Sequence, residues 1–198
     1  MNVQPILILV NGLPGTGKST LATKLSRDLR MPCMGKDMLK EFFYDTLAIE
    51  GREQSRMIGR AVIEMLYTLA ETYLTHRQSL IEECPFFVEY GRPKFQAILA
   101  NHPAHVIEIY CHTEKDERRK RVINRNEGGS RHQGHVEAMN YLGPEDLEPY
   151  DDYAPLAVGD LIKVDTTHFG DTEYERLITD IRSRIKQRTI EPSSEKIK

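Results

Sequence analysis

Apolar residues fall into five short runs, separated by longer segments in which apolar positions recur every three or four residues. The runs have the length of β-strands and lie at Pro5–Asn11, Met31–Gly35, Ser79–Glu83, Ala104–Cys111 and Asp160–Asp165. The intervening spacing predicts helices at Thr20–Leu29, Asp37–Leu47, Glu53–His76, Pro93–Asn101, Glu114–Arg125 and Asp171–Lys186. Strands that alternate with helices predict an α/β protein whose parallel sheet is covered by helices on both faces.

One long segment interrupts this alternation. Residues 126–155 are rich in Gly, His, Asp, Glu and Pro, and a connection of that length is unusual between two packed elements. Together with the preceding helix it predicts a lid region at about residues 114–155. We expect residues 1–188 to form a single domain and residues 189–198 to be a frayed polar tail.

Composition narrows the choice of partners and compartment. The 198 residues carry a formal net charge of −3, which argues against general attraction to nucleic acid or to anionic membranes. No apolar run approaches the ~20 residues of a membrane span, and the first strand lacks a basic leader. The three cysteines have no C-x-x-C spacing, which is typical of reduced thiols in a cytoplasmic protein. Cys84 follows two glutamates, so a reactive thiol is the alternative there to a small core residue.

The candidate chemistry centres on residues 12–19, Gly-Leu-Pro-Gly-Thr-Gly-Lys-Ser, which match the phosphate-binding loop pattern G-x-x-x-x-G-K-[ST]. They stand between a predicted strand and a predicted helix, which is the context that this loop (the P-loop) requires. Backbone N–H groups and the helix N-terminus would surround a polyphosphate, while Lys18 would reach the β/γ-phosphates and Ser19 would ligate Mg²⁺. The predicted nucleotide-binding residues of this segment are Gly12, Pro14, Gly15, Thr16, Gly17, Lys18, Ser19 and Thr20.

Two carboxylate positions follow strands at the edge where open α/β sheets bind ligands. Asp37 could accept the proton of an attacking hydroxyl or hold the water shell of the metal, and it could equally cap the next helix. Glu82 and Glu83 end the third strand, and because side chains alternate along a strand, at most one should face the site. That carboxylate could orient water on Mg²⁺ or bind the acceptor, and a solvated strand end is the alternative.

Basic residues gather after the fourth strand. Arg118, Arg121 and Arg125 share one stripe of the predicted helix, and Arg131, His132 and His135 follow in the loop. A guanidinium can stabilise the charge on a moving phosphoryl group, although Glu114, Asp116 and Glu117 could simply pair with these arginines. The two histidines lack the further ligands of a zinc site. Thr166, in the turn after the last strand, could lie beside adenine or ribose, or form a local turn.

In this combination the chain resembles the small P-loop kinases of the nucleoside-kinase-like group. It is most similar to a branch of AAA-type predicted kinases that resembles chloramphenicol phosphotransferase and zeta toxin. The residues that carry this resemblance are Gly12–Thr20, Asp37, Glu83–Phe86, the pair Arg121 and Arg125, residues 131–135, and Val164–Thr167. The resemblance implies a three-layer P-loop NTPase fold with strand order 2-3-1-4-5, Mg²⁺ and ATP, and a lid whose arginines close over the phosphates. It also implies an acceptor hydroxyl near Asp37.

The sequence therefore predicts an ATP-dependent phosphotransferase that acts on a small hydroxylated molecule. Lys18, Asp37, Arg121 and Arg125 would be catalytic, and Asp37, Glu83 and Arg131 would contact the acceptor. A polynucleotide 5′-kinase is disfavoured because no continuous basic track is present. The alternative of a different kind is a nucleotide-dependent regulator that hydrolyses ATP slowly.

Overall fold

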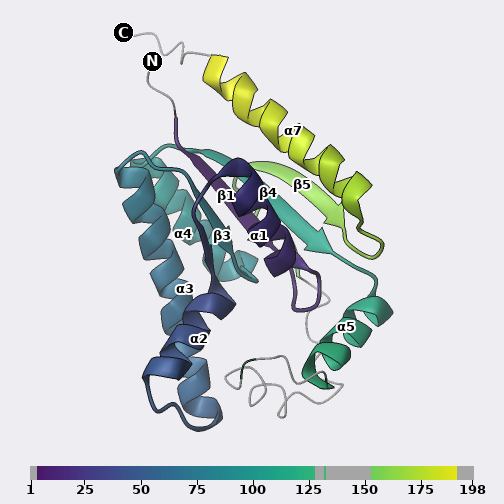
Figure 1. The fold of residues 1–198 in the computed structure, drawn as a ribbon. Coiled ribbons are helices and arrows are strands. Elements are labelled where there is room, and N and C mark those ends of the chain that lie inside the picture. Colours follow the sequence, from purple (N-terminus) through teal and green to yellow (C-terminus); the bar gives the residue numbers. More distant parts are fainter. Residues whose placement is uncertain (1–3, 128–131, 133–152, 191–198) are drawn as a thin grey trace.

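The molecule is built on one five-stranded parallel sheet (Figure 1). The computed structural model describes residues 4–127, 132 and 153–190. The sheet has the order β2-β3-β1-β4-β5, formed by Ile6–Asn11 (β1), Cys33–Gly35 (β2), Leu80–Glu83 (β3), His105–His112 (β4) and Asp160–Asp165 (β5). This order and the parallel pairing confirm the predicted fold. Because every strand runs the same way, the carboxyl ends of all five meet at one edge.

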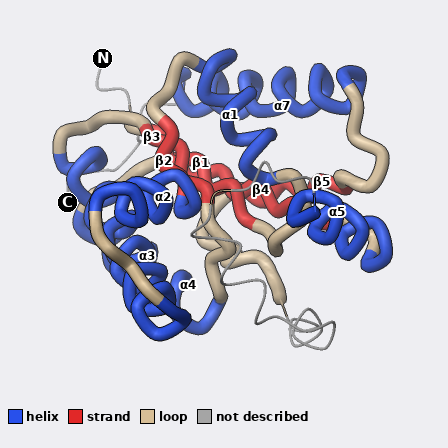
Figure 2. Tube along the Cα trace, turned by 60° about the horizontal axis from the view of Figure 1, so that its bottom comes forward, coloured by secondary structure: helices blue, strands red, loops and turns tan. Residues whose placement is uncertain are grey.

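Helices cover both faces of the sheet, which makes three layers (Figure 2). α1 (Lys18–Leu29) and α7 (Asp171–Ile190) lie on one face, and α3 (Gly51–Thr75) and α4 (Val88–Asn101) on the other. α2 (Lys36–Thr46) and α5 (Lys115–Glu127) flank the carboxyl edge (Figure 1). The strand alternation sends Ile8 and Val10 toward α1 and α7, and Leu7 and Leu9 toward α3 and α4.

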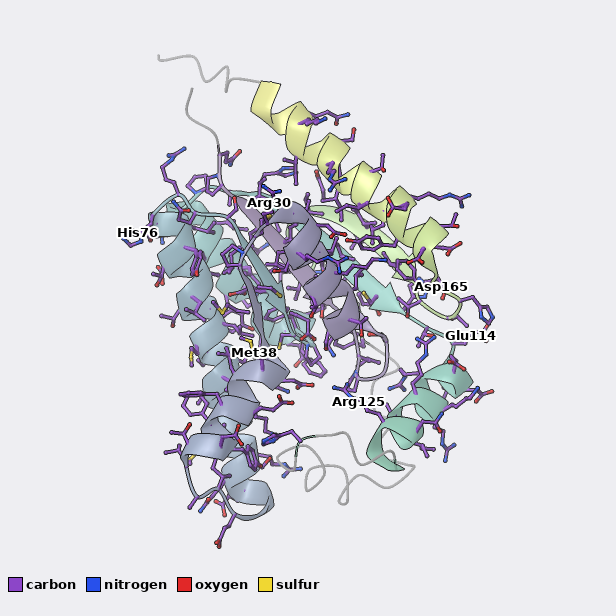
Figure 3. All side chains as sticks on the ribbon, in the orientation of Figure 1. Arg30, Met38, His76, Glu114, Arg125 and Asp165 are labelled. Atoms are coloured by element: carbon purple, nitrogen blue, oxygen red, sulfur yellow. The ribbon has the colours of Figure 1, made fainter. Side chains whose placement is uncertain are left out.

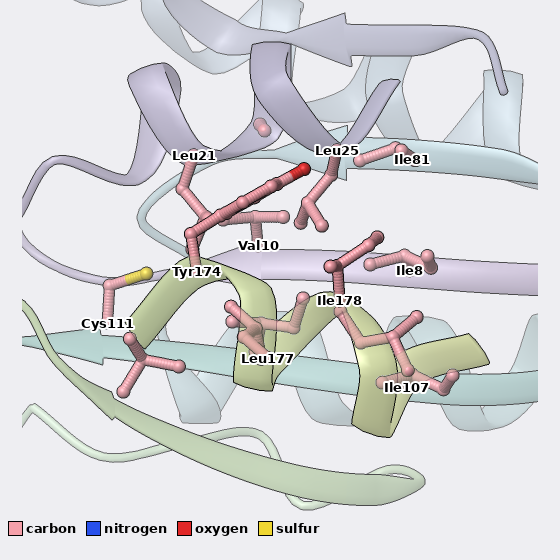
Figure 4. Close-up of a cluster of buried hydrophobic side chains, with 14 residues drawn as sticks. Ile8, Val10, Leu21, Leu25, Ile81, Ile107, Cys111, Tyr174, Leu177 and Ile178 are labelled. Atoms are coloured by element: carbon pink, nitrogen blue, oxygen red, sulfur yellow. The ribbon is translucent and has the colours of Figure 1, made fainter. Parts of the chain in front are cut away.

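Each face has its own apolar core. The α1/α7 core packs Leu21 and Leu25 of α1 and Tyr174 of α7 against the isoleucines of the sheet (Figure 4). The α3/α4 core centres on three mutually packed rings, with Phe95 5.2 Å from both Tyr67 and Phe86, centroid to centroid. Fully burying an apolar side chain of this size contributes about 1.5–3 kcal/mol, so the central strand is held strongly from both sides.

The helix boundaries differ from the sequence predictions by up to five residues, and the differences in α2, α4 and α7 bear on the argument. α2 begins at Lys36 with Gly35 as its N-cap, so Asp37 lies in the first turn and is not the cap. α4 begins at Val88, five residues before Pro93, and Gly91 in its first turns packs closely on Leu156; a Cβ there would lie 2.9 Å from Leu156 Cδ2. α7 continues to Ile190, so the predicted frayed tail is wrong at residues 189 and 190, and residues 191–198 lie outside the described part.

Within the described residues, no helix combines the length and the apolar character needed to cross a membrane.

Candidate functional site

The P-loop connects the end of β1 to the start of α1 and is shaped by its glycines. Gly15 and Gly17 have φ angles of 87° and 73°, in the left-handed region that glycine tolerates best. A Cβ on Gly15 would lie 2.9 Å from the backbone oxygen of Arg118, so this glycine also allows α5 to pack on the loop. α1 starts at Lys18, so the P-loop leads directly into a helix N-terminus, whose free N–H groups favour anions.

A buried ion pair lies beside this loop. Lys18 Nζ is 3.2 Å from Glu83 Oε1, and the two side chains are 8% and 5% exposed. Gly35, at the end of β2, leaves the space for the carboxylate, because a Cβ there would lie 3.0 Å from Glu83 Oε2. The carboxylate at the end of β3 is therefore positioned next to the lysine that would hold the β/γ-phosphates.

The neighbouring glutamate points the other way, as the strand alternation predicted. Glu82 is fully buried on the α3/α4 face, and neither of its carboxyl oxygens has a hydrogen-bond partner among the described residues. Burial raises the pKa of Glu82 well above its usual value, and the backbone of Ala70 nearby offsets only part of this. Glu83, and not Glu82, is the carboxylate that the structure places beside the P-loop.

Asp37 lies beside the strand ends of β2 and β3, and its role toward an acceptor stays a prediction. It is half-buried in the first turn of α2, two residues after Gly35, which pairs with Glu83 in the sheet. His132 also lies against α2: its Nε2 is 2.9 Å from Asp45 Oδ1 and its ring packs edge-on to Tyr44. Arg131 and His135, which the sequence analysis also singled out, lie outside the described residues.

In the arginine stripe of α5, Arg121 contacts both a carboxylate of its own helix and the turn after β5. Arg121 pairs with Glu117 at 2.9 Å and donates to the carbonyl oxygens of Thr166 and Thr167, each at 2.9 Å. Arg121 therefore forms the ion pair within α5 that the sequence allows, and it also attaches α5 to the turn after β5. Figure 3 shows Glu114, before α5, close to Asp165 of β5, where Glu114 N–H donates to the Thr167 hydroxyl.

The other two arginines of the stripe differ in their surroundings. Arg118 lines a cavity of about 230 Å³ beside the P-loop, together with Leu13, Tyr110 and Tyr153. Arg125, labelled in Figure 3, is exposed near the C-terminal end of α5. The role of Arg125 toward a phosphate therefore stays a prediction.

Thr166 joins the P-loop to the end of β5. Its hydroxyl lies 2.9 Å from the carbonyl oxygens of both Thr16 and His112, and its side chain is buried. This contact puts the turn after β5 directly beside the P-loop, although the nucleotide-binding role of Thr166 itself stays a prediction. Asp165 Oδ1 accepts from the Thr167 N–H at 2.9 Å, so a local turn, the alternative role for this segment, is present.

The cysteines are thiols in apolar surroundings. Burial raises the pKa of Cys84 and of Cys111 to about 12, and that of Cys33 to about 11. A thiol with so high a pKa carries almost no thiolate at neutral pH. The core interpretation of Cys84 is therefore the better one.

Sequence reasoning missed a buried polar cluster on the α3/α4 face, immediately behind the P-loop. Its members are Asn11 and Glu108, which are fully buried, and the half-buried Tyr153; Asn11 is hydrogen-bonded to each of the other two. The available signal was a polar residue, Asn11, at the end of an otherwise apolar strand. Tyr153 could not be found in this way, since it follows a long irregular segment.

Comparison with known proteins identifies this architecture. The family model for the AAA domain matches residues 7–142. A proposed kinase from Chloroflexus aurantiacus J-10-fl has a similar structure, with 34% sequence identity and a TM-score of 0.82, over 92% of this chain and 99% of the other. Comparison with curated proteins gave no match.

More distant structures share the fold alone. The APS kinase CysC of Mycobacterium tuberculosis, solved with AMPPNP and APS, has 14% identity and a TM-score of 0.60, over 91% of this chain and 99% of that one. Chaetomium thermophilum Kti12, solved with ADP-AlF3, has 16% identity and a TM-score of 0.57 over the same shares. The fold is that of P-loop kinases, and the closer resemblance to chloramphenicol phosphotransferase and zeta toxin stays a prediction.

Proposed function

We propose that this chain, which belongs to the AAA domain family, transfers the γ-phosphoryl group of ATP to a hydroxyl group of a small molecule. The observation that carries the proposal is the buried pair of Lys18 and Glu83, 3.2 Å apart beside the P-loop. It supports phosphoryl transfer because a polyphosphate site and a carboxylate that can act on its metal lie in direct contact. The more general role, nucleotide binding, rests on the P-loop itself.

The residues present fit Mg²⁺ and ATP. Lys18 and the P-loop N–H groups would hold the β/γ-phosphates, and the Ser19 hydroxyl would ligate Mg²⁺, with Glu83 oriented toward its bound water. Bound Mg²⁺ would neutralise charge on the β- and γ-phosphate oxygens. Lys18 pairs with Glu83, and Gly35 leaves the space that the Glu83 carboxylate occupies beside the phosphate site.

In the transfer itself, the acceptor oxygen forms a bond to the γ-phosphorus while the bond to the β,γ-bridging oxygen breaks. ADP leaves, and the hydroxyl proton passes to Asp37, the proposed base. Asp37 suits this role because it lies at the start of α2, next to the strand ends that carry Gly35 and Glu83. Arg125 and Arg121 would stabilise the transferred charge, Arg121 by exchanging two neutral carbonyl partners for phosphate oxygens.

The test is ATP consumption by the purified protein with Mg²⁺ against a panel of hydroxylated metabolites and antibiotics. Lys18→Met should abolish acceptor-dependent turnover. The matched control is Lys24→Met, which removes a lysine from the same helix, where Lys24 pairs with Asp171 at the surface. A compound that accelerates turnover in wild type and in Lys24→Met, but not in Lys18→Met, would establish the kinase and its acceptor class. GTP in place of ATP tests the donor.

Two other outcomes would redirect the proposal. If ATP binds but no acceptor in the panel accelerates turnover, the small-molecule kinase interpretation fails and a nucleotide-dependent regulator becomes the better one. An oligonucleotide in the same panel, assayed at two salt concentrations, tests the polynucleotide 5′-kinase. Strong salt dependence of transfer to it would support that alternative.

A further inference from the structure

The side chain of Asn11 occupies a central position behind the P-loop. It is the last residue of β1, directly precedes Gly12, and is fully buried on the α3/α4 face of the sheet. A buried amide needs partners for both its oxygen and its nitrogen, so its neighbours reveal its role.

The hydrogen bonds of this amide fix its orientation. Asn11 Oδ1 accepts from the backbone N–H groups of Gly12 and Phe86, both at 2.9 Å. Asn11 Nδ2 donates to Glu108 Oε1 at 3.1 Å and to the Phe86 carbonyl oxygen at 3.4 Å. The N–H groups of Gly12 and Phe86 can only donate, so they require the amide oxygen. The Glu108 carboxylate and the Phe86 carbonyl accept in this arrangement, so they require the amide nitrogen. Reversing the amide would therefore break all four contacts.

Each partner belongs to a different part of the site. Gly12 opens the P-loop, and Phe86 follows Glu83 by three residues. The pairing of β1 with β3 ends at Val10 and Glu83, and the Asn11 amide then binds both the N–H and the C=O of Phe86. The side chain thus replaces the next backbone rung and holds the chain that leaves Glu83.

A third contact reaches the segment Tyr153–Val158, which leads into β5. The Tyr153 hydroxyl donates to Asn11 Oδ1, and the Tyr153 carbonyl oxygen accepts from the Tyr110 hydroxyl at 2.9 Å. The ring of Tyr153 stacks on Tyr110 and meets Phe87 edge-on. The segment is therefore attached directly to the residue that precedes the P-loop.

Glu108 secures the same segment from the other side of the amide. Its two carboxylate oxygens accept from the N–H groups of Leu156 and Ala157, at 2.6 and 2.7 Å. Ala157 has a φ angle of 52°, which is costly for a residue other than glycine. In this turn two successive N–H groups face one carboxylate. The hydrogen bonds to Glu108 therefore help to hold Ala157 in its unfavourable conformation.

We propose that Asn11 is a positioning residue that couples the P-loop to the Tyr153–Val158 segment and to the chain that follows Glu83. The amide holds the first N–H of the P-loop, and an ordered loop in turn holds Tyr153. By thermodynamic reciprocity, nucleotide binding at the loop then tightens the segment, and loosening the segment weakens nucleotide binding. This inference builds on the proposed nucleotide site but does not depend on which acceptor is used.

The test uses Tyr153→Phe, which removes only the hydroxyl that reaches Asn11. The matched control is Tyr174→Phe, which removes a tyrosine hydroxyl bonded to Asp28 at 2.7 Å on the opposite face of the sheet. Losing one hydrogen-bonded link should raise the Kd for ATP about three- to tenfold in Tyr153→Phe, and leave it unchanged in the control. Thermal unfolding of both variants separates this effect from a general loss of stability.

Hydrogen exchange provides the readout that a merely structural role would not change. In wild type and in Tyr174→Phe, ATP should slow exchange at the amides of Leu156 and Ala157; in Tyr153→Phe this response should be lost. Asn11→Asp, which sets an oxygen against Glu108 and the Phe86 carbonyl, should weaken ATP binding more than Tyr153→Phe. Wild-type Kd together with an unchanged exchange response in Tyr153→Phe would overturn the coupling.

The coupling and the kinase proposal fail separately. Loss of the exchange response in Tyr153→Phe, in a protein that transfers phosphate to no acceptor, would support the coupling and refute the kinase. Transfer to an identified acceptor, with an unaltered response in Tyr153→Phe, would refute the coupling alone.

Discussion

Glu82 should make the stability of this protein fall as the pH rises. Its carboxyl group is fully buried, has no hydrogen-bond partner among the described residues, and has a pKa well above the usual 4.5 because of burial. In the unfolded chain the same group ionises near 4.5. Between these two pKa values the folded protein keeps a proton that the unfolded chain releases, so the contribution of Glu82 to stability is complete below pH 4.5 and decreases above it.

The magnitude follows from proton linkage. In the window between the two pKa values, the free energy of unfolding should fall by up to about 1.4 kcal/mol for each pH unit. Glu82→Gln keeps the shape of the neutral acid but cannot ionise, so it should lack this slope and be more stable than wild type at neutral pH. Glu82→Leu also removes the buried polar atoms, each of which costs about 1–3 kcal/mol when unpaired, and should be more stable still.

Urea unfolding of wild type, Glu82→Gln and Glu82→Leu over pH 4.5–8 measures these differences directly. Glu89→Gln is the control, since Glu89 is an exposed glutamate in the first turn of α4. Wild-type and Glu82→Gln curves that run parallel across this range would refute the reasoning. They would mean that the carboxyl group ionises without penalty, for instance through a partner that stabilises its charge.

Three other perturbations test the packing and the site. Gly35→Ala places a Cβ 3.0 Å from Glu83 Oε2, so the carboxylate must shift; we expect a clear loss of turnover with little change in ATP affinity, and unchanged kinetics would contradict this. Phe95→Ala empties the centre of the α3/α4 core and should lower the free energy of unfolding by about 3–5 kcal/mol in urea titrations. Cys84 and Cys111 should react with a thiol reagent at pH 8 only as fast as the protein opens, because burial holds each pKa near 12; rapid labelling of the folded protein would argue against this.

The P-loop part of the candidate site could be predicted from the sequence because its residues are contiguous. The P-loop is a contiguous segment whose glycines and lysine act through their own backbone and side chain, so residues 12–19 could be recognised without a fold. The strands could also be predicted from the sequence, since a buried parallel strand is apolar at almost every position. Alternation along β3 also implied correctly that Glu82 and Glu83 face opposite sides.

The tertiary structure decided which distant groups meet. Glu83 was separated from Glu82 only when β3 was placed beside β1 and Lys18 came within 3.2 Å. Arg121 fits a phosphate-binding pattern in sequence, yet its carbonyl partners lie 45 and 46 residues away on the β5 turn. Asn11 and Tyr153 are 142 residues apart, and no periodicity relates them. Spacing along a chain encodes which face a residue occupies within one helix or strand, whereas contacts between elements depend on how those elements pack, and only the folded sheet specifies that.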